Sequence, residues 1–393
     1  MNKITDEKKC TGCSACYNIC PKNCISMITN QEGFLHPAVD SSLCINCNLC
    51  EKICPINNRQ EKKSILKSFG ANAKDIELRQ VSSSGGLFSI MAQSIIETGG
   101  IIFGAAFSED YQIVKHTYID KIEDIYKLRM SKYVQSAIGD AYSLVKHFLL
   151  EGKKVLFCGT PCQIAGLKSF LRREYINLIT LDFICHGVPS PRIWSSYITY
   201  RKKQLGGEIQ QVSFRNKETG WRHFSLRIDA TDGNYYSSPI SKDMYLRGFV
   251  NNLLLRPSCY KCDFKEGRSG ADITLADFWS VDSVAPELND DSGMSLLLIH
   301  TNTGDNLLSE IRNKISIIEI TEEQALLHNS SYQKSVSPPK KRDEFFSFAK
   351  KNGDVRALKK YTRSTMIIRF KVIASEVMNF VGKEKGVNIN EKS

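Results

Sequence analysis

Residues 10–21 read CTGCSACYNICP and residues 44–55 read CINCNLCEKICP, with the same cysteine spacing in both stretches. In each, three cysteines are separated by two residues, and a fourth follows after three more, directly before a proline. Three thiolates at this spacing can hold three irons of a cubane cluster, while the fourth cysteine is turned away from its own loop. The doubled pattern therefore predicts a small N-terminal domain that binds metal.

This doubled motif resembles bacterial two-cluster ferredoxins, in which the cysteine before the proline ligates the other cluster. The resemblance implies one [4Fe-4S] cluster on Cys10, Cys13, Cys16 and Cys54, and a second on Cys44, Cys47, Cys50 and Cys20. The alternatives are zinc knuckles, which usually pair two CxxC units across a longer loop, and disulfides, which need an oxidising compartment. Cys24 falls outside the pattern, and we expect it to be a small core residue rather than a ligand.

The length and composition of the chain predict more than this one domain. A chain of 393 residues is too long for a ferredoxin alone, and 42% hydrophobic residues predict ordinary folded cores in two or three domains. We find no apolar N-terminal signal segment and no run of eighteen apolar residues, which predicts a cytoplasmic protein. Fourteen cysteines in a reducing compartment indicate metal ligation rather than disulfides.

We expect three regions, namely a ferredoxin-like domain over residues 1–60, an α/β domain over residues 64–335, and a basic helical tail over residues 338–393. In the first, a hairpin is expected from residues 25–28 and 34–39. In the second, expected strands lie at 66–73, 101–107, 112–118, 153–157, 177–184, 211–214, 224–229, 273–276, 294–300 and 315–320. Expected helices lie at 87–97, 139–151, 161–172, 191–204 and 242–249. This alternation predicts an α/β (α+β) fold with a mixed sheet and ligand loops at the carboxyl ends of strands.

Three loops between expected strands and helices carry candidate chemistry. Ser83, Ser84, Gly85 and Gly86 precede a helix, where free N–H groups and the helix dipole suit a phosphate, although an ordinary helix cap looks the same. A second loop holds Cys158 and Cys162, and a third begins at Cys185. With a later CxxC pair these form a candidate third cluster site, made of Cys162, Cys185, Cys259 and Cys262. Buried thiols and a four-cysteine zinc site remain alternatives, and Cys158 could replace Cys162 as the ligand.

Six ordered segments within residues 66–328 resemble one known family. They are SSSGG (82–86), SKYVQS (131–136), GTPCQ (159–163), CHGVPSP (185–191), RPSCYKC (256–262) and DITLADFW (272–279). The family is that of the beta subunits of coenzyme F420 hydrogenases and dehydrogenases, here following a ferredoxin domain. Its members carry a flavin, FAD, beside an iron–sulfur cluster in an α/β domain.

The resemblance implies a set of cofactor positions in this chain. The implied flavin-contacting residues are Ser83, Ser84, Gly85, Gly86, Ser131, Lys132, Tyr133, Gly159, Thr160 and Pro161. Cys162, Cys185, Cys259 and Cys262 match the cluster cysteines of the family. Two residues are candidate catalytic groups: Lys132 could stabilise a reduced, anionic flavin ring, and His186 could donate a proton to a substrate. The alternatives are an exposed lysine and a core histidine without a catalytic role.

These observations predict an iron–sulfur flavoprotein oxidoreductase. Electrons would come from a low-potential donor protein, pass through the 4Fe-4S clusters to FAD, and leave as a pair to a deazaflavin coenzyme or another small conjugated substrate. The alternative is an electron-transfer subunit that has no substrate of its own and serves a partner enzyme.

The formal net charge of +11 is concentrated near the C-terminus, where residues 340–371 hold eleven Lys or Arg against three acids. Residues 366–381 are predicted to form an amphipathic helix, because apolar residues recur close to the helical period at Ile367, Phe370, Ile373, Val377 and Phe380. This helix could pack on the domain as a solvated basic surface, or contact an anionic membrane or acidic partner. No nucleic-acid motif accompanies the charge, so we expect no nucleic-acid partner.

Overall fold

The computed structural model describes residues 4–59 and 61–363. Its main body is an eight-stranded sheet. The strands are β3 (Lys67–Ala73), β4 (Ile101–Phe107), β5 (Val114–Ile119), β6 (Val155–Cys158), β7 (Leu178–Phe183), β11 (Ile273–Asp277), β12 (Ser295–Ile299) and β13 (Ile315–Glu319). Their order is β13-β3-β12-β11-β7-β6-β4-β5. The four neighbours β11, β7, β6 and β4 are parallel and the outer pairs are antiparallel, so the expected mixed sheet is confirmed.

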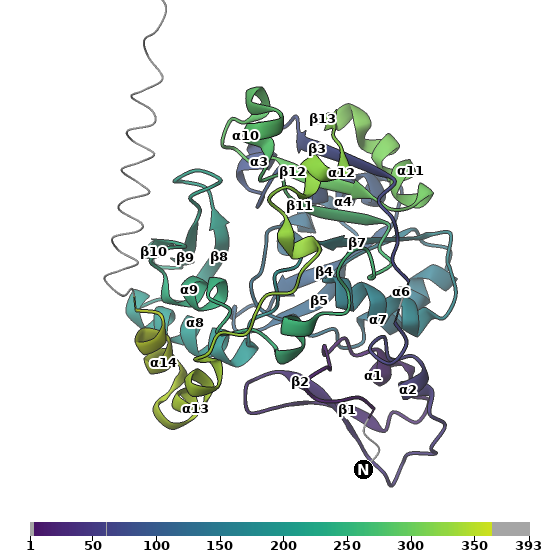
Figure 1. The fold of residues 1–393 in the computed structure, drawn as a ribbon, viewed down its shortest axis with the longest axis vertical. Helices are drawn as coiled ribbons and strands as arrows, with labels where there is room; N and C mark the ends of the chain where they lie inside the picture. Colours follow the sequence, from purple (N-terminus) through teal and green to yellow (C-terminus); the bar gives the residue numbers. More distant parts are fainter. Residues whose placement is uncertain (1–3, 60, 364–393) are drawn as a thin grey trace, which may run out of the picture.

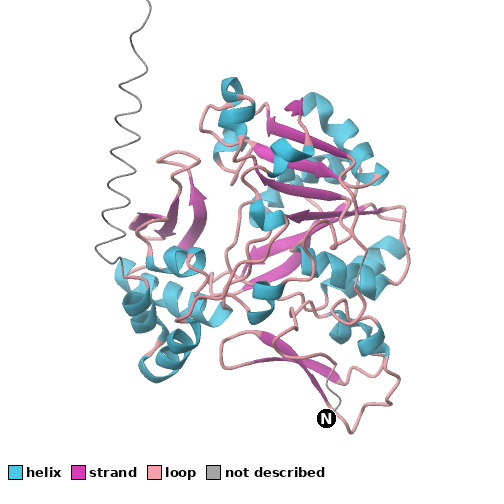
Figure 2. Cartoon of the chain, in the orientation of Figure 1, coloured by secondary structure: helices cyan, strands magenta, loops and turns pink. Residues whose placement is uncertain are grey.

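Helices cover both faces of this sheet (Figures 1 and 2). The helices α4 (Leu87–Glu97) and α11 (Asn302–Ile311) cover one face, and α6 (Ala141–Leu150) and α7 (Pro161–Leu171) cover the other. Strand β6 shows the two-residue period, because Leu156 joins the core under α4 while Val155 and Phe157 join the core under α7. A sheet buried on both faces explains the nearly continuous apolar runs of these strands.

A second lobe stands beside the main sheet, at the left of Figure 1. Its sheet is made of β8 (Ile209–Asn216), β9 (Ser225–Ala230) and β10 (Tyr235–Pro239). Its helices are α8 (Pro191–Leu205), α9 (Met244–Val250), α13 (Arg342–Asn352) and α14 (Asp354–Tyr361). An aromatic core joins these elements through Trp194, Phe214, Tyr245 and Phe345. The packed body therefore continues through the first two helices of the segment expected as a basic tail.

The N-terminal unit comprises α1 (Ala15–Ile19), β1 (Ile25–Thr29), β2 (Leu35–Val39) and α2 (Leu49–Lys52). The expected hairpin is present as the antiparallel pair of β1 and β2. Figure 1 shows the unit beneath α6 and α7. Cys13, Ala15 and Ile53 belong to the same hydrophobic cluster as the buried faces of α6 and α7. The unit is therefore packed onto the main body by a shared core.

Polar contacts also fix the N-terminal unit in place. The guanidinium of Arg342 donates to both carboxylate oxygens of Glu32, at 2.9 and 2.5 Å. The Gln135 side-chain amide donates to the carbonyl of Thr11 at 2.8 Å, and the Tyr17 hydroxyl donates to Asp140 at 3.0 Å. Contacts from such distant segments hold the unit in one orientation.

Four shorter helices are the remaining α-helices of the described residues: α3 (Ile76–Gln80), α5 (Ile125–Leu128), α10 (Val281–Val284) and α12 (Glu322–Leu326). The amphipathic helix expected at residues 366–381 lies outside the described residues. Among the helices of residues 4–59 and 61–363, none has the length and hydropathy needed to span a bilayer.

Candidate metal centres and cofactor loops

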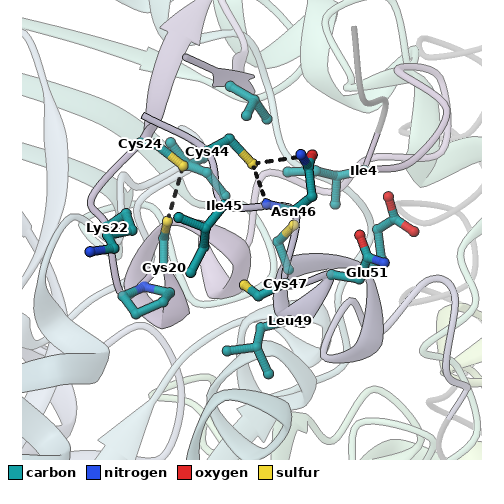
Figure 3. Close-up of a pocket in the computed structure, with 15 residues that line it drawn as sticks. Ile4, Cys20, Lys22, Cys24, Cys44, Ile45, Asn46, Cys47, Leu49 and Glu51 are labelled. Carbon is teal, nitrogen blue, oxygen red and sulfur yellow. Dashed lines mark hydrogen bonds between the residues drawn. The ribbon is translucent and has the colours of Figure 1, made fainter. Parts of the chain in front are cut away.

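Two cavities in the N-terminal unit are lined by cysteines from both halves of the repeat. One is walled by an inner set, Cys10, Cys13, Cys16 and Cys54. The other is walled by an outer set, Cys20, Cys44, Cys47 and Cys50 (Figure 3). In each, three cysteines come from one motif and the fourth comes from the other motif. This is the crossed arrangement that the resemblance to two-cluster ferredoxins implies.

The two sets differ in their exposure to solvent. All four inner cysteines are buried, whereas Cys47 of the outer set is exposed. Burial raises the pKa of Cys13 to about 12 and also raises the pKa of Cys16, because desolvation disfavours the thiolate. Thiols in such a place become thiolates when a metal takes the place of the proton. The inner cavity therefore suits a metal cluster shielded from water, and the outer cavity suits one near the surface.

The backbone of the two cysteine loops repeats as well. Gly12 and Asn46, each two residues after the first cysteine of a motif, have φ of +68° and +54°. In this left-handed conformation each donates its N–H to the sulfur of that first cysteine at 3.4 Å. Glycine and asparagine are the residues that adopt this conformation most readily. Such N–H···S contacts are among those that set the reduction potential of an iron–sulfur cluster.

Cys24 is buried, as the sequence indicated, and it also lines the outer cavity. Its sulfur lies 3.3 Å from that of Cys20, as Figure 3 shows. Five thiols thus surround the outer cavity, although the motif supplies only four.

A third set of cysteines gathers beneath the sheet. Cys162 lies in the first turn of α7, and Cys185 follows β7. Cys259 lies within a 3-10 turn at Pro257–Lys261, and Cys262 follows that turn directly. The pKa of Cys162 is raised first by burial and then by the nearby thiols of Cys262 and Cys185. Burial raises the pKa of Cys259 to about 12, and the thiols of Cys262 and Cys162 add to this shift. All four thiols therefore influence one another electrostatically, which places them in one region of the fold.

Cys158 belongs to a different environment. Its pKa is raised to about 12 by burial, and the charges that act on it are those of Asp182 and Lys132 rather than those of the third set. Its side chain packs against the core under α4, on the opposite face of the sheet from α7. Of the two cysteines in this loop, Cys162 is the one that faces the other three.

A buried lysine accompanies the third set. Lys265 is 8% exposed, and its ammonium donates to the carbonyls of Cys185 and Ser331, both at 2.6 Å. Within the part of the chain that the structure describes, no carboxylate forms an ion pair with it. A buried cation without a carboxylate requires another source of negative charge, which thiolate-bound clusters supply. Apart from its position three residues after Cys262, nothing in the sequence marks this lysine.

All fourteen cysteines are free thiols. Across residues 4–59 and 61–363, no three His, Cys, Asp or Glu side chains converge tightly enough to hold one metal ion. The cysteines of the inner and outer sets surround cavities, as ligands of a polynuclear cluster do, rather than meeting at one point as four zinc ligands do.

The candidate flavin loops lie at the carboxyl edge of the parallel strands. Gly86 begins α4 with φ of +83°, and Gly85 donates its N–H to the Ser295 hydroxyl at 2.9 Å. A β-carbon on Gly85 would lie 2.6 Å from the carbonyl oxygen of Ala71, so the close approach of β3 requires glycine there. The Ser84 hydroxyl donates to the carbonyl of Met294 at 2.9 Å. Ser84 and Gly85 thus make structural contacts with the neighbouring strands.

The loop after α5 meets this helix start. The N–H of Ser131 donates to the Ser83 hydroxyl at 2.7 Å, which joins the two loops. The Lys132 ammonium donates to the carbonyls at the end of α5, with its shortest bond, 2.9 Å, to Arg129, and burial lowers its pKa to about 7. Arg129 itself is half-buried, and its guanidinium has no hydrogen-bond or ion-pair partner among the described residues.

The remaining expected positions have defined partners. Thr160 caps α7 in a capping box with Gln163, Pro161 is its first residue, and the Gly159 N–H bonds to the carbonyl of Leu181. The ring of Tyr133 stacks on Phe249 with centroids 4.6 Å apart. His186 is hydrogen-bonded to the Asn252 side chain at 2.6 Å, and burial lowers its pKa. His186 and Tyr133 both contact Phe249, which places them around one aromatic ring.

Comparison with known proteins gives two matches of family models. Residues 152–324 match the model that describes the C-terminal part of the coenzyme F420 hydrogenase/dehydrogenase beta subunit. Residues 9–58 match the model described as a 4Fe-4S dicluster domain. These matches cover both halves of the resemblance that the sequence motifs indicated. No match to a curated protein was found.

Among solved structures, one similar chain comes from the F420-reducing [NiFe] hydrogenase complex of Methanosarcina barkeri. The identity is 17%, the TM-score is 0.46, and the similarity covers 76% of this chain and 91% of that chain. At this level the likeness carries no argument about function.

Proposed function

We propose that this chain is an iron–sulfur flavoprotein oxidoreductase. It belongs to the coenzyme F420 hydrogenase/dehydrogenase beta subunit family and carries an N-terminal 4Fe-4S dicluster domain. It accepts single electrons from a low-potential donor protein through 4Fe-4S clusters, and reduces a small two-electron acceptor by way of FAD. The acceptor is a deazaflavin coenzyme or another conjugated molecule.

The observation that carries this proposal is the order of the three cysteine sets. The outer set includes the exposed Cys47, so it can meet a donor at the surface. The inner set is buried against α7, where Cys13 is close enough to Cys162 to influence its pKa. The pKa of Tyr142, whose hydroxyl donates to the carbonyl of Gln163 at 2.7 Å, is raised by burial and then by both of these cysteines. One route therefore leads from the surface through the N-terminal unit to the third set.

A third cluster on Cys162, Cys185, Cys259 and Cys262 is part of the proposal. Three separate elements bring these thiols together, and Lys265 supplies a buried positive charge beside them. Burying an ammonium without a carboxylate partner is costly, and ordinary core cysteines, which are neutral thiols, would not offset that cost. The Thr160 hydroxyl also lies 3.1 Å from the Cys162 sulfur, as a contact that would orient this ligand.

The residues that would hold the proposed FAD are those at the start of α4, together with Ser131, Lys132, Tyr133 and the Gly159–Pro161 loop. Arg129, half-buried without a partner among the described residues, supports an anionic occupant beside the Ser83–Ser131 contact. FAD supplies the conversion of single electrons into pairs. Lys132 would balance negative charge, and His186, held by Asn252, would donate a proton to the acceptor.

Metal and flavin analysis tests this function. The chain, purified without oxygen, is expected to hold about twelve irons, about twelve sulfides and one FAD. About eight irons with no flavin would overturn the enzyme proposal. The same preparation, reduced chemically, is expected to transfer electron pairs to a deazaflavin acceptor, and a chain that reduces only one-electron dyes would not support the proposal.

A second function, an electron-transfer subunit without its own substrate, is favoured by one observation. Ser84, Gly85 and Lys132 all bond to backbone or side-chain groups of this chain, so much of the expected flavin loop is occupied by structural contacts. Eight or twelve irons without flavin, together with fast electron exchange with a partner enzyme, would identify this function.

A further inference from the structure

Arg256 is a buried arginine of the N-terminal interface whose hydrogen-bond partners are all neutral. Only 1% of its surface is exposed. Its Nε donates to the carbonyl of Cys10 at 2.7 Å, and its Nη1 donates to Oε1 of Gln135 at 3.0 Å. Its Nη2 donates to the carbonyl of Leu35 at 2.8 Å and contacts the ring of His36 at 3.2 Å. Burial and the nearby guanidinium lower the pKa of His36 to about 4, so that ring is neutral.

The other buried arginines differ from Arg256 in one respect. Each of them donates to a carboxylate, in the pairs Arg79–Asp290, Arg215–Asp277 and Arg342–Glu32. Arg256 has no carboxylate partner anywhere in the described ranges. An isolated charge is costly to bury, so its negative counterpart must come from something else.

The position of Arg256 indicates that counterpart. A β-carbon on Gly12, inside the inner cysteine loop, would lie 2.8 Å from Nη1 of Arg256. On the other side, the Cys259 N–H donates to the carbonyl of Arg256 at 3.0 Å, and the arginine lowers the pKa of that cysteine against the larger effect of burial. Arg256 therefore stands between the inner set and the third set. Both sets carry negative charge when their thiolates hold clusters.

We propose that the charge of Arg256 raises the reduction potentials of clusters bound by the inner and third sets relative to that of a cluster bound by the outer set. Reduction adds one negative charge to a cluster site, and Arg256 stabilises that charge in a buried, weakly screened place. Lys22, which lines the outer cavity, is exposed to solvent and its charge is screened, so electrons are drawn inward. This rests on the proposed function only in requiring clusters at the inner and third sets.

A purely structural role is the alternative, because Arg256 joins the N-terminal unit to the main body by its hydrogen bonds. Charge and shape are separated by Arg256→Lys, which keeps the charge, and Arg256→Gln, which removes it. EPR-monitored redox titration of the purified full chain measures each cluster potential. We expect lower inner and third potentials in Arg256→Gln, potentials near wild type in Arg256→Lys, and an unchanged outer potential in both.

Gln135 gives a second test that keeps the arginine. Gln135→Glu sets a carboxylate against Nη1 of Arg256 and should lower the inner potential, whereas Gln135→Met, which loses the same amide bond to Thr11, should not. Arg342→Gln removes an interface arginine that already has a carboxylate, and should leave the inner potential unchanged.

Unchanged inner potentials in Arg256→Gln and Gln135→Glu, with wild-type iron content, would overturn the inference. So would equal shifts in Gln135→Glu and Gln135→Met. Failure of the proposed function is seen separately, as missing iron or flavin in the wild-type chain.

Discussion

Gly166 of α7 and Cys13 of the inner set are in direct contact. A β-carbon built on Gly166 would lie 2.9 Å from Cβ of Cys13 and 3.0 Å from its sulfur. The same atom would lie 2.9 Å from the hydroxyl of Tyr142. The glycine therefore allows the inner cysteine loop to approach α7, whose first turn holds Cys162 of the third set.

Gly166→Ala is expected to weaken this contact. Overpacking costs about 1–3 kcal/mol, against roughly 1 kcal/mol that alanine adds to a helix, so we expect a lower melting temperature and some loss of inner-set iron. Gly104→Ala on β4 is the control, because its added carbon would make only ordinary contact with Leu128, at 3.4 Å. Equal melting temperature and iron content in the two variants would contradict the prediction.

Crossed ligation predicts which cysteine substitutions share a phenotype. Cys54→Ala and Cys10→Ala should abolish the same EPR signal, because both residues line the inner cavity. Cys20→Ala should instead match Cys44→Ala, since both line the outer cavity. Grouping of Cys54 with Cys44 would show that each motif binds its own cluster.

The third set predicts a difference between two cysteines four residues apart. Cys162→Ser and Cys259→Ser should each remove about four irons and leave the spectra of the N-terminal pair intact. Cys158→Ser should keep its iron, because Cys158 faces the core under α4. If the iron content of Cys259→Ser equals that of wild type, no cluster is bound there.

The Glu32–Arg342 ion pair should contribute to stability more than an exposed pair does. Glu32→Gln leaves the Arg342 guanidinium, 8% exposed, without its carboxylate. We expect a loss of roughly 1–3 kcal/mol in the free energy of unfolding, discounted from a fully buried pair because Glu32 is partly exposed. Asp305→Asn, which removes the exposed Lys67 pair, should cost about 0–1 kcal/mol. Chemical denaturation measures both, and equal losses would refute the expectation.

His116 predicts a pH dependence of stability. Burial lowers its pKa from 6.5 to about 4 in the folded chain. Its Nδ1 is hydrogen-bonded to the Ser136 hydroxyl, and its Nε2 to the carbonyl of Cys158. Between these values the unfolded chain binds a proton that the folded chain does not, so stability falls as pH falls from 6.5 to about 4. His116→Leu should flatten this part of the curve relative to wild type. If denaturation shows the same loss of stability between pH 7 and pH 4.5 in His116→Leu as in wild type, this role for His116 is contradicted.

The cysteine motif was predictable because its ligands are local in sequence. The resemblance of the doubled spacing to two-cluster ferredoxins implied the crossed sets. The glycine-rich start of α4 and the Thr160–Pro161 cap of α7 also followed from local rules. Strand β10 was not expected, because the polar run Tyr235–Pro239 pairs only through its neighbour β9.

The buried cations lay beyond sequence reasoning. Arg256 and Lys265 are single basic residues near a CxxC pair, with no period or spacing that marks them. Their roles depend on carbonyls of Cys10 and Cys185, which only the fold brings near. The choice between Cys158 and Cys162 likewise depends on which face of the sheet each side chain occupies. Tertiary placement, not residue type, decides such questions.

Because the N-terminal unit shares a core with α6 and α7, it differs from a carrier domain tethered by a flexible linker. A carrier on a flexible linker delivers electrons at a rate set by its effective concentration near the receiving site. Here Cys13 is fixed against Gly166, so the inner set stays at one distance from α7. Under the proposed function, delivery inside the chain would therefore not depend on linker length, and only the encounter of a donor with the outer set near the exposed Cys47 would depend on diffusion.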